Sequence, residues 1–532
     1  MKVLKIIIII LVVSFSRWSL AEEVVEQPDA PPAKQSNCFE INEIAFKGAT
    51  HMSKNQRSEL LKKYERRCLG GSDIQILVRE VANYYIGNGH VSTRVSIPEQ
   101  NLRSGKLVLE VHEGKVEHVE YQESGTNSGR NRFNILPDPR NQILNLRDLE
   151  QAVDNMSRLK SNNTTMRLQP GSKENTSVVV IDNKQDKKWF VTTGLDNYGS
   201  KYKGQIESST SVTLEDMFGM SEIYSVGHKR SLGDPSQRLT RSYSGAVSVP
   251  YGYNNLTVSY AYTNYRSFIQ ATSQKFKNNG NTRLLNVKLD RVIHRDGEGK
   301  TIASIGLARE NYSNYIADTK IQISSYKIKK MDFGLKHQRK LSKSILGLGL
   351  DYTYGINANF VEKFGSKIYP AHTFQKLNYD ISWIRPFALN KIPAALKFTS
   401  SIHGQYSPNV LCGSDKINVG GFTSVRGFKE SGENTDNGAF VRNEVSLGMS
   451  KFFGNMNNKI SEDIEVFLAY DIGRFWGDDE QGKVRGTMSG GAMGVRNTQG
   501  ILTFDITLAK AFSSKYVKRT PTELYMSANL NI

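Results

Sequence analysis

Long apolar runs are missing from this chain of 532 residues. The longest, Ile6–Phe15, is too short to cross a bilayer comfortably as a helix, which needs about 20 residues. A transmembrane helix is therefore excluded, but a transmembrane β-barrel is not. The run follows the basic segment Met1–Lys5 and precedes Ser19–Ala21, an acceptable cleavage sequence. We therefore predict a secretory signal peptide over residues 1–21, cleaved after Ala21.

Catalytic signatures are also missing. The chain has no Gly-x-Ser-x-Gly elbow, no His-Glu-x-x-His and no Cys-x-x-Cys, and its nine histidines are scattered. A phosphate-binding loop is absent as well. These absences disfavour an enzyme such as a barrel lipase or protease, and they predict neither a cofactor nor a metal site.

Acidic residues are scarce relative to basic ones, 52 against 70, which gives a formal net charge of +18. A basic solvated surface or a basic barrel lumen accounts for this balance. Because no nucleic-acid-binding motif accompanies the charge, we predict no nucleic-acid partner. Apolar residues make up only 38% of the chain, yet it holds 24 tyrosines and 44 glycines, which fits short strands joined by polar loops.

Cysteine is nearly absent, with three in the whole chain. Cys38 and Cys68 lie close together in sequence and would meet an oxidising compartment after export. We predict that they pair, which would stabilise the fold by roughly 3–4 kcal/mol through restriction of the unfolded chain. Cys412 is left over and is predicted to be free.

Two tandem modules are predicted after a polar, proline-bearing linker over residues 22–37. The first, residues 38–113, has the order strand, helix, helix, strand, strand. Its second helix presents one apolar face, formed by Ile74, Leu77, Val78, Val81 and Tyr85. Ser72 and Gln75 predict a capping box at the start of that helix. The same order recurs in residues 114–186, with Asn145 as the predicted cap of the module's helix.

The periodicity changes from helical to strictly alternating over residues 187–532. The last strand is the clearest example, with apolar side chains at Leu524, Met526, Ala528, Leu530 and Ile532. Alternation of this kind over about ten residues is typical of a membrane barrel strand. About sixteen such segments predict a transmembrane antiparallel β-barrel. A soluble β-sandwich would explain the alternation, but not the signal peptide together with sixteen segments.

Alternation also orients Asp471. Its neighbours Tyr470 and Ile472 belong to the apolar face of their strand, and a carboxylate facing lipid would be costly, so Asp471 is predicted to face the lumen. Beside it, Gly473 leaves a recess that a long side chain could fill. Arg426 is the candidate, because it lies in a glycine-rich segment, residues 407–437, that is far longer than a turn requires. A solvated arginine in an extracellular loop is the alternative.

These residues resemble a known family. Val425-Arg426-Gly427-Phe428, taken with Phe467, Asp471 and Gly473, resembles the paired motifs of the two-partner secretion transporters, the TpsB group of haemolysin and adhesin exporters and activators. The two N-terminal modules are similar to that family's polypeptide-transport-associated (POTRA) modules. The matching segments there are Cys38-Phe39-Glu40-Ile41, Arg67-Cys68-Leu69-Gly70, Tyr85–Arg94, Glu113–Glu117 and Leu146–Ala152. Gly490–Arg496 resembles the late-barrel glycine segment.

The resemblance implies an outer-membrane protein with periplasmic POTRA modules. These would capture an unfolded exoprotein through its N-terminal two-partner secretion domain, and the barrel would conduct it outward without nucleotide. The sixth loop would fold into the lumen, anchored through Arg426 and Asp471. Other expected partners are outer-membrane lipid, the barrel-assembly machinery and periplasmic chaperones.

Two features depart from the family pattern. Residues 22–37 would make only about 24 Å of helix, too little for both a pore-plugging helix and its linker, so gating is expected to rest on the loop. The chain also ends in Ile532 where an aromatic residue is common.

Two other functions remain as alternatives. A passive porin would leave the two modules without a role, whereas a barrel-assembly insertase usually carries more POTRA modules.

Overall fold

The computed structural model describes residues 38–532 except 124–125, 128–133, 137–138, 202–203, 235–237, 271–273, 358–372, 389–394, 450–463, 480–481 and 516–521. The predicted signal peptide, its cleavage site after Ala21 and the linker over residues 22–37 lie outside these residues. Within them, no helix is both long and apolar enough to cross a membrane. The described residues divide into two compact units, residues 38–85 with 93–113 and residues 86–92 with those from 114 to 532.

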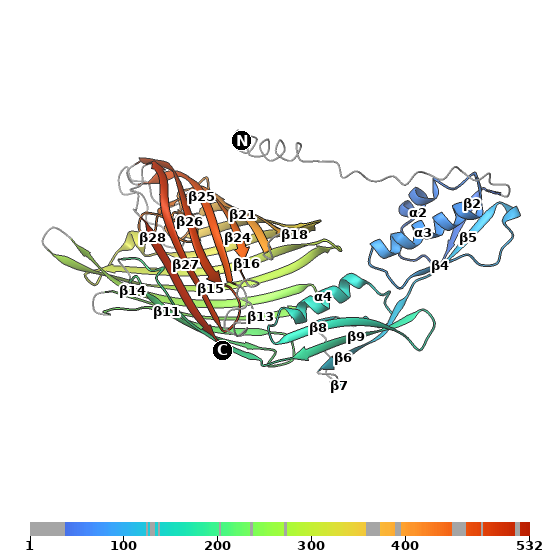
Figure 1. Cartoon of the computed structure of the whole chain (residues 1–532), viewed down its shortest axis with the longest axis horizontal. Helices are drawn as coiled ribbons and strands as arrows, with labels where there is room; N and C mark the ends of the chain where they lie inside the picture. The colour runs from blue at the N-terminus through green and yellow to red at the C-terminus, as the bar shows by residue number, and fades with distance from the viewer. Residues whose placement is uncertain are drawn as a thin grey trace. The chain divides into compact units, whose positions relative to one another are not determined.

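The first unit is an α+β module (Figure 1). Its sheet has the order β2-β5-β4, and a separate two-stranded sheet joins β1 to β3. Strands β2 and β5 run parallel, whereas β4 is antiparallel to β5. The elements are β1 (Phe39–Ile41), β2 (Glu43–Lys47), α2 (Lys54–Leu61), β3 (Arg67–Leu69), α3 (Gly71–Gly87), β4 (Arg94–Ser96) and β5 (Lys106–His112).

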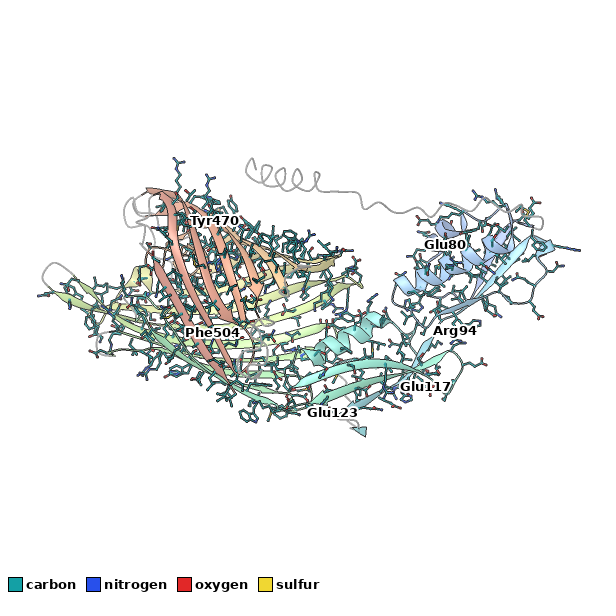
Figure 2. The ribbon with its side chains drawn as sticks, viewed as in Figure 1. Glu80, Arg94, Glu117, Glu123, Tyr470 and Phe504 are labelled. Atoms are coloured by element: carbon teal, nitrogen blue, oxygen red, sulfur yellow. A yellow bond between two sulfur atoms is a disulfide. The ribbon has the colours of Figure 1, made fainter. Side chains whose placement is uncertain are left out.

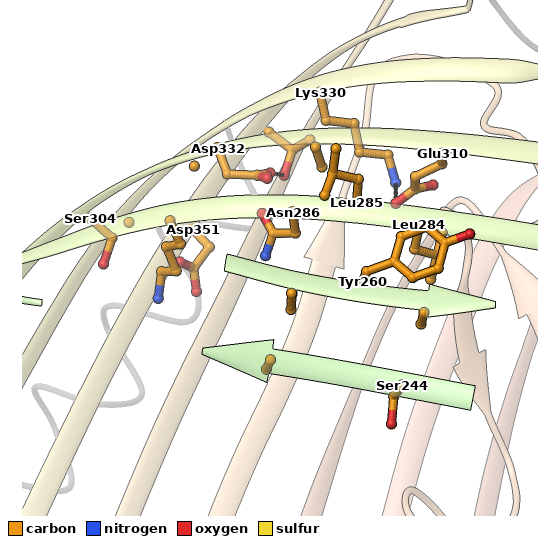
Figure 3. A pocket seen from close by; sticks show the side chains of 18 of the residues that line it. Ser244, Tyr260, Leu284, Leu285, Asn286, Ser304, Glu310, Lys330, Asp332 and Asp351 are labelled. Atoms are coloured by element: carbon orange, nitrogen blue, oxygen red, sulfur yellow. Dashed lines mark hydrogen bonds and ion pairs between the residues drawn. The ribbon is translucent and has the colours of Figure 1, made fainter. Parts of the chain in front are cut away.

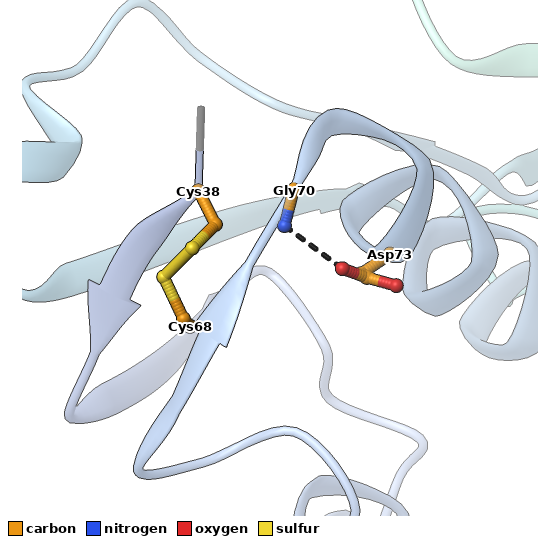
Figure 4. Close-up of a disulfide and its surroundings, with 4 residues drawn as sticks. All are labelled: Cys38, Cys68, Gly70 and Asp73. Carbon is orange, nitrogen blue, oxygen red and sulfur yellow. Dashed lines mark hydrogen bonds between the residues drawn. A yellow bond between two sulfur atoms is a disulfide. The ribbon is translucent and has the colours of Figure 1, made fainter. Parts of the chain in front are cut away.

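The apolar face predicted for α3 forms the core of this module. Ile74, Leu77, Val81 and Tyr85 are buried against the sheet, and Val78 packs at the margin. The predicted capping box is wrong: α3 begins at Gly71, so Ser72 already lies inside the helix. Asp73 instead accepts the backbone N–H of Gly70 (Figure 4). The capping box of the module belongs to α2, where Ser53 and Gln56 bond reciprocally.

The disulfide between Cys38 and Cys68 closes β1 onto β3 (Figure 4). The two cysteines are 30 residues apart in sequence and their Cα atoms are 5.3 Å apart. The loop that they close contains α2, so the bond restricts a large part of a small module. Cys412 is free and buried.

The second unit begins with another α+β module, built around the parallel pair β6 (Lys115–Glu123) and β9 (Thr176–Gln185). Its sheet has the order β7-β6-β9-β8, with β7 (Thr126–Asn127) and β8 (Asn162–Pro170) at the edges. Helix α4 (Leu146–Ser157) buries Leu149, Ala152 and Met156 in the core. Asn145 caps it by accepting the backbone N–H of Arg147, as predicted from the sequence.

A closed antiparallel barrel of sixteen principal strands follows. Closure is made by β10 and β28, where Thr193 pairs with Leu530. Alternation holds along the strands: side chains such as Leu468, Tyr470 and Ile472 are exposed on the outside, while Asp471 is fully buried. Figure 2 marks Tyr470 on β25 and Phe504 on β27.

The strands are β10 (Trp189–Asp196), β11 (Glu207–Glu215), β12 (Ile223–Ser231), β13 (Leu239–Tyr251), β14 (Asn254–Gln270), β15 (Lys275–Arg295), β16 (Gly299–Ile316), β18 (Lys327–Leu341), β19 (Ser344–Asn357), β20 (Thr373–Ala388), β21 (Ala395–Tyr406), β24 (Asn437–Gly448), β25 (Ile464–Asp479), β26 (Gly482–Asn497), β27 (Leu502–Lys515) and β28 (Glu523–Asn531).

Candidate functional site: the loop between β21 and β24

The sixth extracellular connection is the loop of residues 407–436 between β21 and β24. It folds on itself through a short hairpin, β22 (Ile417–Val419) with β23 (Glu433–Thr435). Most of its apolar side chains are buried, and Val419, Val425 and Phe428 pack with Phe475 and Met488 of the barrel wall. The loop is therefore an ordered element packed on the inner wall.

Arg426 of this loop meets Asp471 of β25. The carboxylate accepts hydrogen bonds from Arg426 Nε at 2.6 Å, Nη2 at 2.8 Å and the backbone N at 3.1 Å. Asp471 is 0% exposed and Arg426 is 2% exposed. A two-pronged bond between buried charges is strong and directional. It fixes the position of the loop backbone as well as the side chain.

Further charged groups surround this pair. Glu444 of β24 accepts from Arg426 Nη1 at 3.2 Å and lies 2.6 Å from Arg496 of β26. Arg496 also reaches Glu465 of β25 at 2.8 Å. Alternating charges of this kind satisfy each other where single buried charges would be costly. Sequence reasoning missed Glu444, although alternation on β24 would have placed it on the lumen side.

Phe467 lies between the two guanidinium groups. Its ring centre is 5.9 Å from Arg426 Cζ and 4.8 Å from Arg496 Cζ, so it contributes cation–π contacts to both. The ring is buried, and it fits because Gly494 opposite has no side chain: a Cβ there would come within 2.6 Å of the ring.

Glycines let the loop backbone approach the wall. Gly427 has φ +95°, a conformation that side chains rarely allow, and a Cβ there would lie 2.5 Å from the backbone N of Ala511. At Gly490 of β26, a Cβ would collide with the carbonyl oxygen of Arg426. Both positions therefore require glycine for close contact.

The recess beside Gly473 is filled differently from the prediction. A Cβ on Gly473 would meet Val419 at 2.6 Å and Val425 at 2.8 Å, so valines of the loop occupy this space. Arg426 reaches Asp471 alongside it. The prediction that a long side chain fills the recess is wrong, because the side chains of two loop valines already occupy it.

A second set of ion pairs, made by Asp415, holds the start of the loop to another part of the barrel wall. The buried carboxylate of Asp415 lies 2.6 Å from Lys330 of β18 and 3.0 Å from Lys376 of β20. Lys330 also pairs with Glu310 of β16 at 2.8 Å, as Figure 3 shows. Cys412 is buried just before this contact, beside Ile328 and Phe374. The loop is thus held to β16–β20 near its start and to β24–β27 near Arg426.

A lumen cavity of about 610 Å³ lies against strands β12–β20 (Figure 3). Its lining includes many small or hydroxyl side chains, among them Ser244, Ser259 and Ser304, and also the charged groups of Lys330 and Glu310. The cavity therefore borders the ion pairs that Asp415 of the loop makes with the barrel wall.

Two α+β modules before a closed sixteen-stranded barrel, with an ordered loop packed on the inner wall, define an outer-membrane transporter of the POTRA-plus-barrel class. The chain belongs to the haemolysin secretion/activation protein family ShlB/FhaC/HecB, whose model matches residues 175–497. A ShlB-type POTRA domain matches residues 39–114 and a second POTRA domain matches residues 115–170. It is a two-partner secretion transporter of the outer membrane, with its POTRA modules in the periplasm.

Relatives and solved structures agree with this assignment. The chain is 28% identical over 488 residues to the outer membrane transporter CdiB of Dickeya dadantii, covering 91% of this chain and 85% of the relative. It is 26% identical over 456 residues to the haemolysin transporter ShlB of Serratia marcescens, covering 86% and 80%. CdiB from Escherichia coli has the same fold, with a TM-score of 0.86 at 24% identity over 96% of this chain and 93% of that one.

Proposed function

We propose that the chain exports one secreted exoprotein, captured by its POTRA modules through an N-terminal two-partner secretion domain, and that the Arg426–Asp471 pair anchors the loop that gates the barrel. The observation that carries the gating proposal is the buried, three-fold hydrogen bonding of Arg426 to Asp471. The transporter family and the relatives named for haemolysin transport support an exoprotein as cargo. Val425, Gly427, Phe428, Phe467 and Gly473 complete the proposed anchor.

The capture step would use a sheet edge. Strand β8 lies at the edge of its sheet, is nine residues long and is largely exposed beyond Thr164. The edge strands of the first module are shorter, with five residues in β2 and three in β4. An extended polypeptide can add to such an edge through main-chain hydrogen bonds. We therefore place the capture site at β8, with residues 38–113 and 114–186 as the two modules.

The gating step would displace the loop from the lumen. The lumen cavity lies against β12–β20. Its lining includes Lys330 and Lys376, which pair with Asp415, but neither Arg426 nor Asp471. An unfolded chain entering this cavity would compete for Lys330 and Lys376 before it disturbed Arg426. The ion pairs of Asp415 would then break first, while the Arg426–Asp471 pair keeps the loop attached to the barrel wall.

Comparison of culture supernatants from cells with and without the transporter tests export. One large polypeptide should disappear when the transporter is deleted and return when it is supplied again. An unchanged supernatant combined with loss of many outer-membrane proteins would instead indicate an insertase.

Cross-linking tests capture. A photoreactive side chain at Arg167 in β8 should cross-link to the exoprotein during export, whereas one at Lys47 in β2 should not. Equal cross-linking at both positions would contradict capture at β8.

A further inference from the structure

Six cations form a row on the outer face of the barrel. They are contributed one per strand by β12, β13, β14, β15, β16 and β18: Arg230, Arg241, Arg266, Arg283, Arg309 and Lys329. Alternation places them outside, because the next residues along these strands, such as Glu310 after Arg309 and Lys330 after Lys329, line the lumen cavity. Arg283, Arg309 and Lys329 are exposed, and the other three are partly exposed.

Strand register places the cations of this row close to one another on neighbouring strands, with the widest step between Arg266, which pairs with Asn279, and Arg283, four residues further along β15. Arg230 pairs directly with Arg241, and Arg309 pairs directly with Lys329. Between them, Arg241 pairs with Asn264, two residues from Arg266. Arg283 lies over the ring of Tyr262 at 5.9 Å, and Leu285, two residues further on, pairs with Arg309. Neighbouring strands are about 4.8 Å apart, so each cation has another within one or two strands.

The row lies at the upper edge of the apolar band. On β15, the outward residues Leu285, Val287 and Leu289 are exposed, and Arg283 and Arg291 bracket them. Eight residues of a strand tilted by about 40° rise on the order of 20 Å, which is close to the height of the apolar band of such barrels, about 25 Å. Because β15 is the sixth strand after the periplasmic modules, it runs inward, and Arg283 lies on the extracellular side.

No carboxylate neutralises the row from its own strands. In the described residues of these six strands the carboxylates are Asp290, Glu310 and Asp332, and all occupy lumen-facing positions. Nε of Arg230 is buried and has no hydrogen-bond partner among the described residues. Among the described residues of these six strands, the outward side chains at this level thus include six cations and no carboxylate.

We propose that this row binds the phosphate groups of the phosphorylated glycolipid that forms the outer leaflet of the bacterial outer membrane. Five of the six cations are arginines, whose planar donors suit phosphate oxygens. A row several strands wide matches a headgroup that carries more than one phosphate better than a headgroup with one. The inference goes beyond export and rests only on the location of the barrel in the outer membrane.

Binding of purified lipid A to the detergent-solubilised full chain tests the proposal, with native mass spectrometry as the readout. Replacing three cations together, Arg241→Gln, Arg283→Gln and Arg309→Gln, should weaken binding of bisphosphorylated lipid A roughly tenfold or more. Monophosphorylated lipid A should bind the wild-type chain more weakly than the bisphosphorylated form. The single variant Arg283→Gln should give a smaller loss in the same direction, which keeps the test decisive if the triple variant fails to assemble.

Arg291→Gln is the matched control, since it removes an outward arginine from the periplasmic end of the same strand. It should leave lipid A binding unchanged. Binding that survives the triple or the Arg283→Gln replacement, or that falls equally with Arg291→Gln, would overturn the proposal. Equal binding of phosphatidylglycerol and lipid A by the wild-type chain would also overturn it, because the row would then act as a general anion surface.

Discussion

Arg426 donates three hydrogen bonds to Asp471, 45 residues further along the chain, and one of them comes from its backbone. The carboxylate therefore holds the turn of the loop as well as the guanidinium group. Replacement of Arg426 by alanine would remove the two side-chain bonds and leave the backbone bond. The pair is the point at which the loop is most directly tied to the barrel wall.

Arg426→Lys should impair export almost as much as Arg426→Ala. A lysine keeps the charge but cannot make the two-pronged contact that positions the loop. Alanine removes the charge as well, and a buried carboxylate left without its partner costs about 3–5 kcal/mol. Secretion should fall sharply, while heat-modifiable migration in gels shows a normally assembled barrel. Asp471→Asn should behave similarly. Normal export by Arg426→Ala would show that the loop needs no anchor at this position.

Gly490→Ala should reduce export through a steric effect alone. Its new methyl group would collide with the Arg426 carbonyl and push the loop from the wall, although no charge is altered. Gly245→Ala is the control, because its Cβ would lie at an ordinary 3.9 Å from the Ser225 carbonyl. If both variants export equally well, close packing of the loop is not required.

Asp415→Asn should loosen the start of the loop without releasing the Arg426 anchor. The loss of charge leaves Lys330 and Lys376 facing a neutral partner in a buried setting. In planar bilayers the variant channel should open more often than the wild type. Lys336→Met, at a lumen-facing position on the same strand as Lys330, should not change the opening frequency. Unchanged openings in Asp415→Asn would rule out gating by this contact.

Cys38→Ser combined with Cys68→Ser should lower the free energy of unfolding of the first module by about 3–4 kcal/mol, because a loop of about 30 residues is released. Urea denaturation of residues 38–113, followed by circular dichroism, measures this loss. In the full chain, Cys412→Ser should leave hydrogen exchange in the module unchanged, since Cys412 belongs to the barrel loop. A loss well below 1 kcal/mol would show that the disulfide has little effect on the module.

The first module should lose stability in acid because of Glu113. Burial raises the pKa of this carboxyl, but hydrogen bonds from Thr50, the backbone of His51 and Tyr85 outweigh burial, so the pKa is lowered. A lowered pKa stabilises the folded state above the unfolded value, about 4.3, and this contribution disappears as pH falls through the folded value.

Urea denaturation of residues 38–113 at several pH values between 7 and 3 measures this effect. Glu113→Gln should flatten the acid limb of the stability profile, whereas Glu99→Gln, at an exposed position, should retain it. Identical profiles for the wild type and Glu113→Gln would contradict the assignment.

The sequence by itself determined the architecture, because strand and helix periodicities are local. Alternation in β25 placed Asp471 in the lumen, and the spacing of Leu77, Val81 and Tyr85 marked the buried face of α3. The ends of helices were predicted less accurately. Ser72 and Gln75 fit the pattern of a capping box, but in the structure Asp73 makes the contact with Gly70 instead. Ser72 and Asp73 are adjacent in the sequence, and the residue pattern does not show which of them makes the contact at the start of the helix.

Tertiary structure alone decided how the loop is held. Glu444, Arg496 and Lys330 come from different strands and Asp415 comes from the loop, and only barrel closure and loop packing bring their charges within 4 Å of their partners. The recess at Gly473 is likewise filled by Val419 and Val425 of the loop, whose side chains leave no space there for an arginine. Periodicity fixes which way a side chain faces, whereas the partner it meets depends on the packing of segments far apart in the chain.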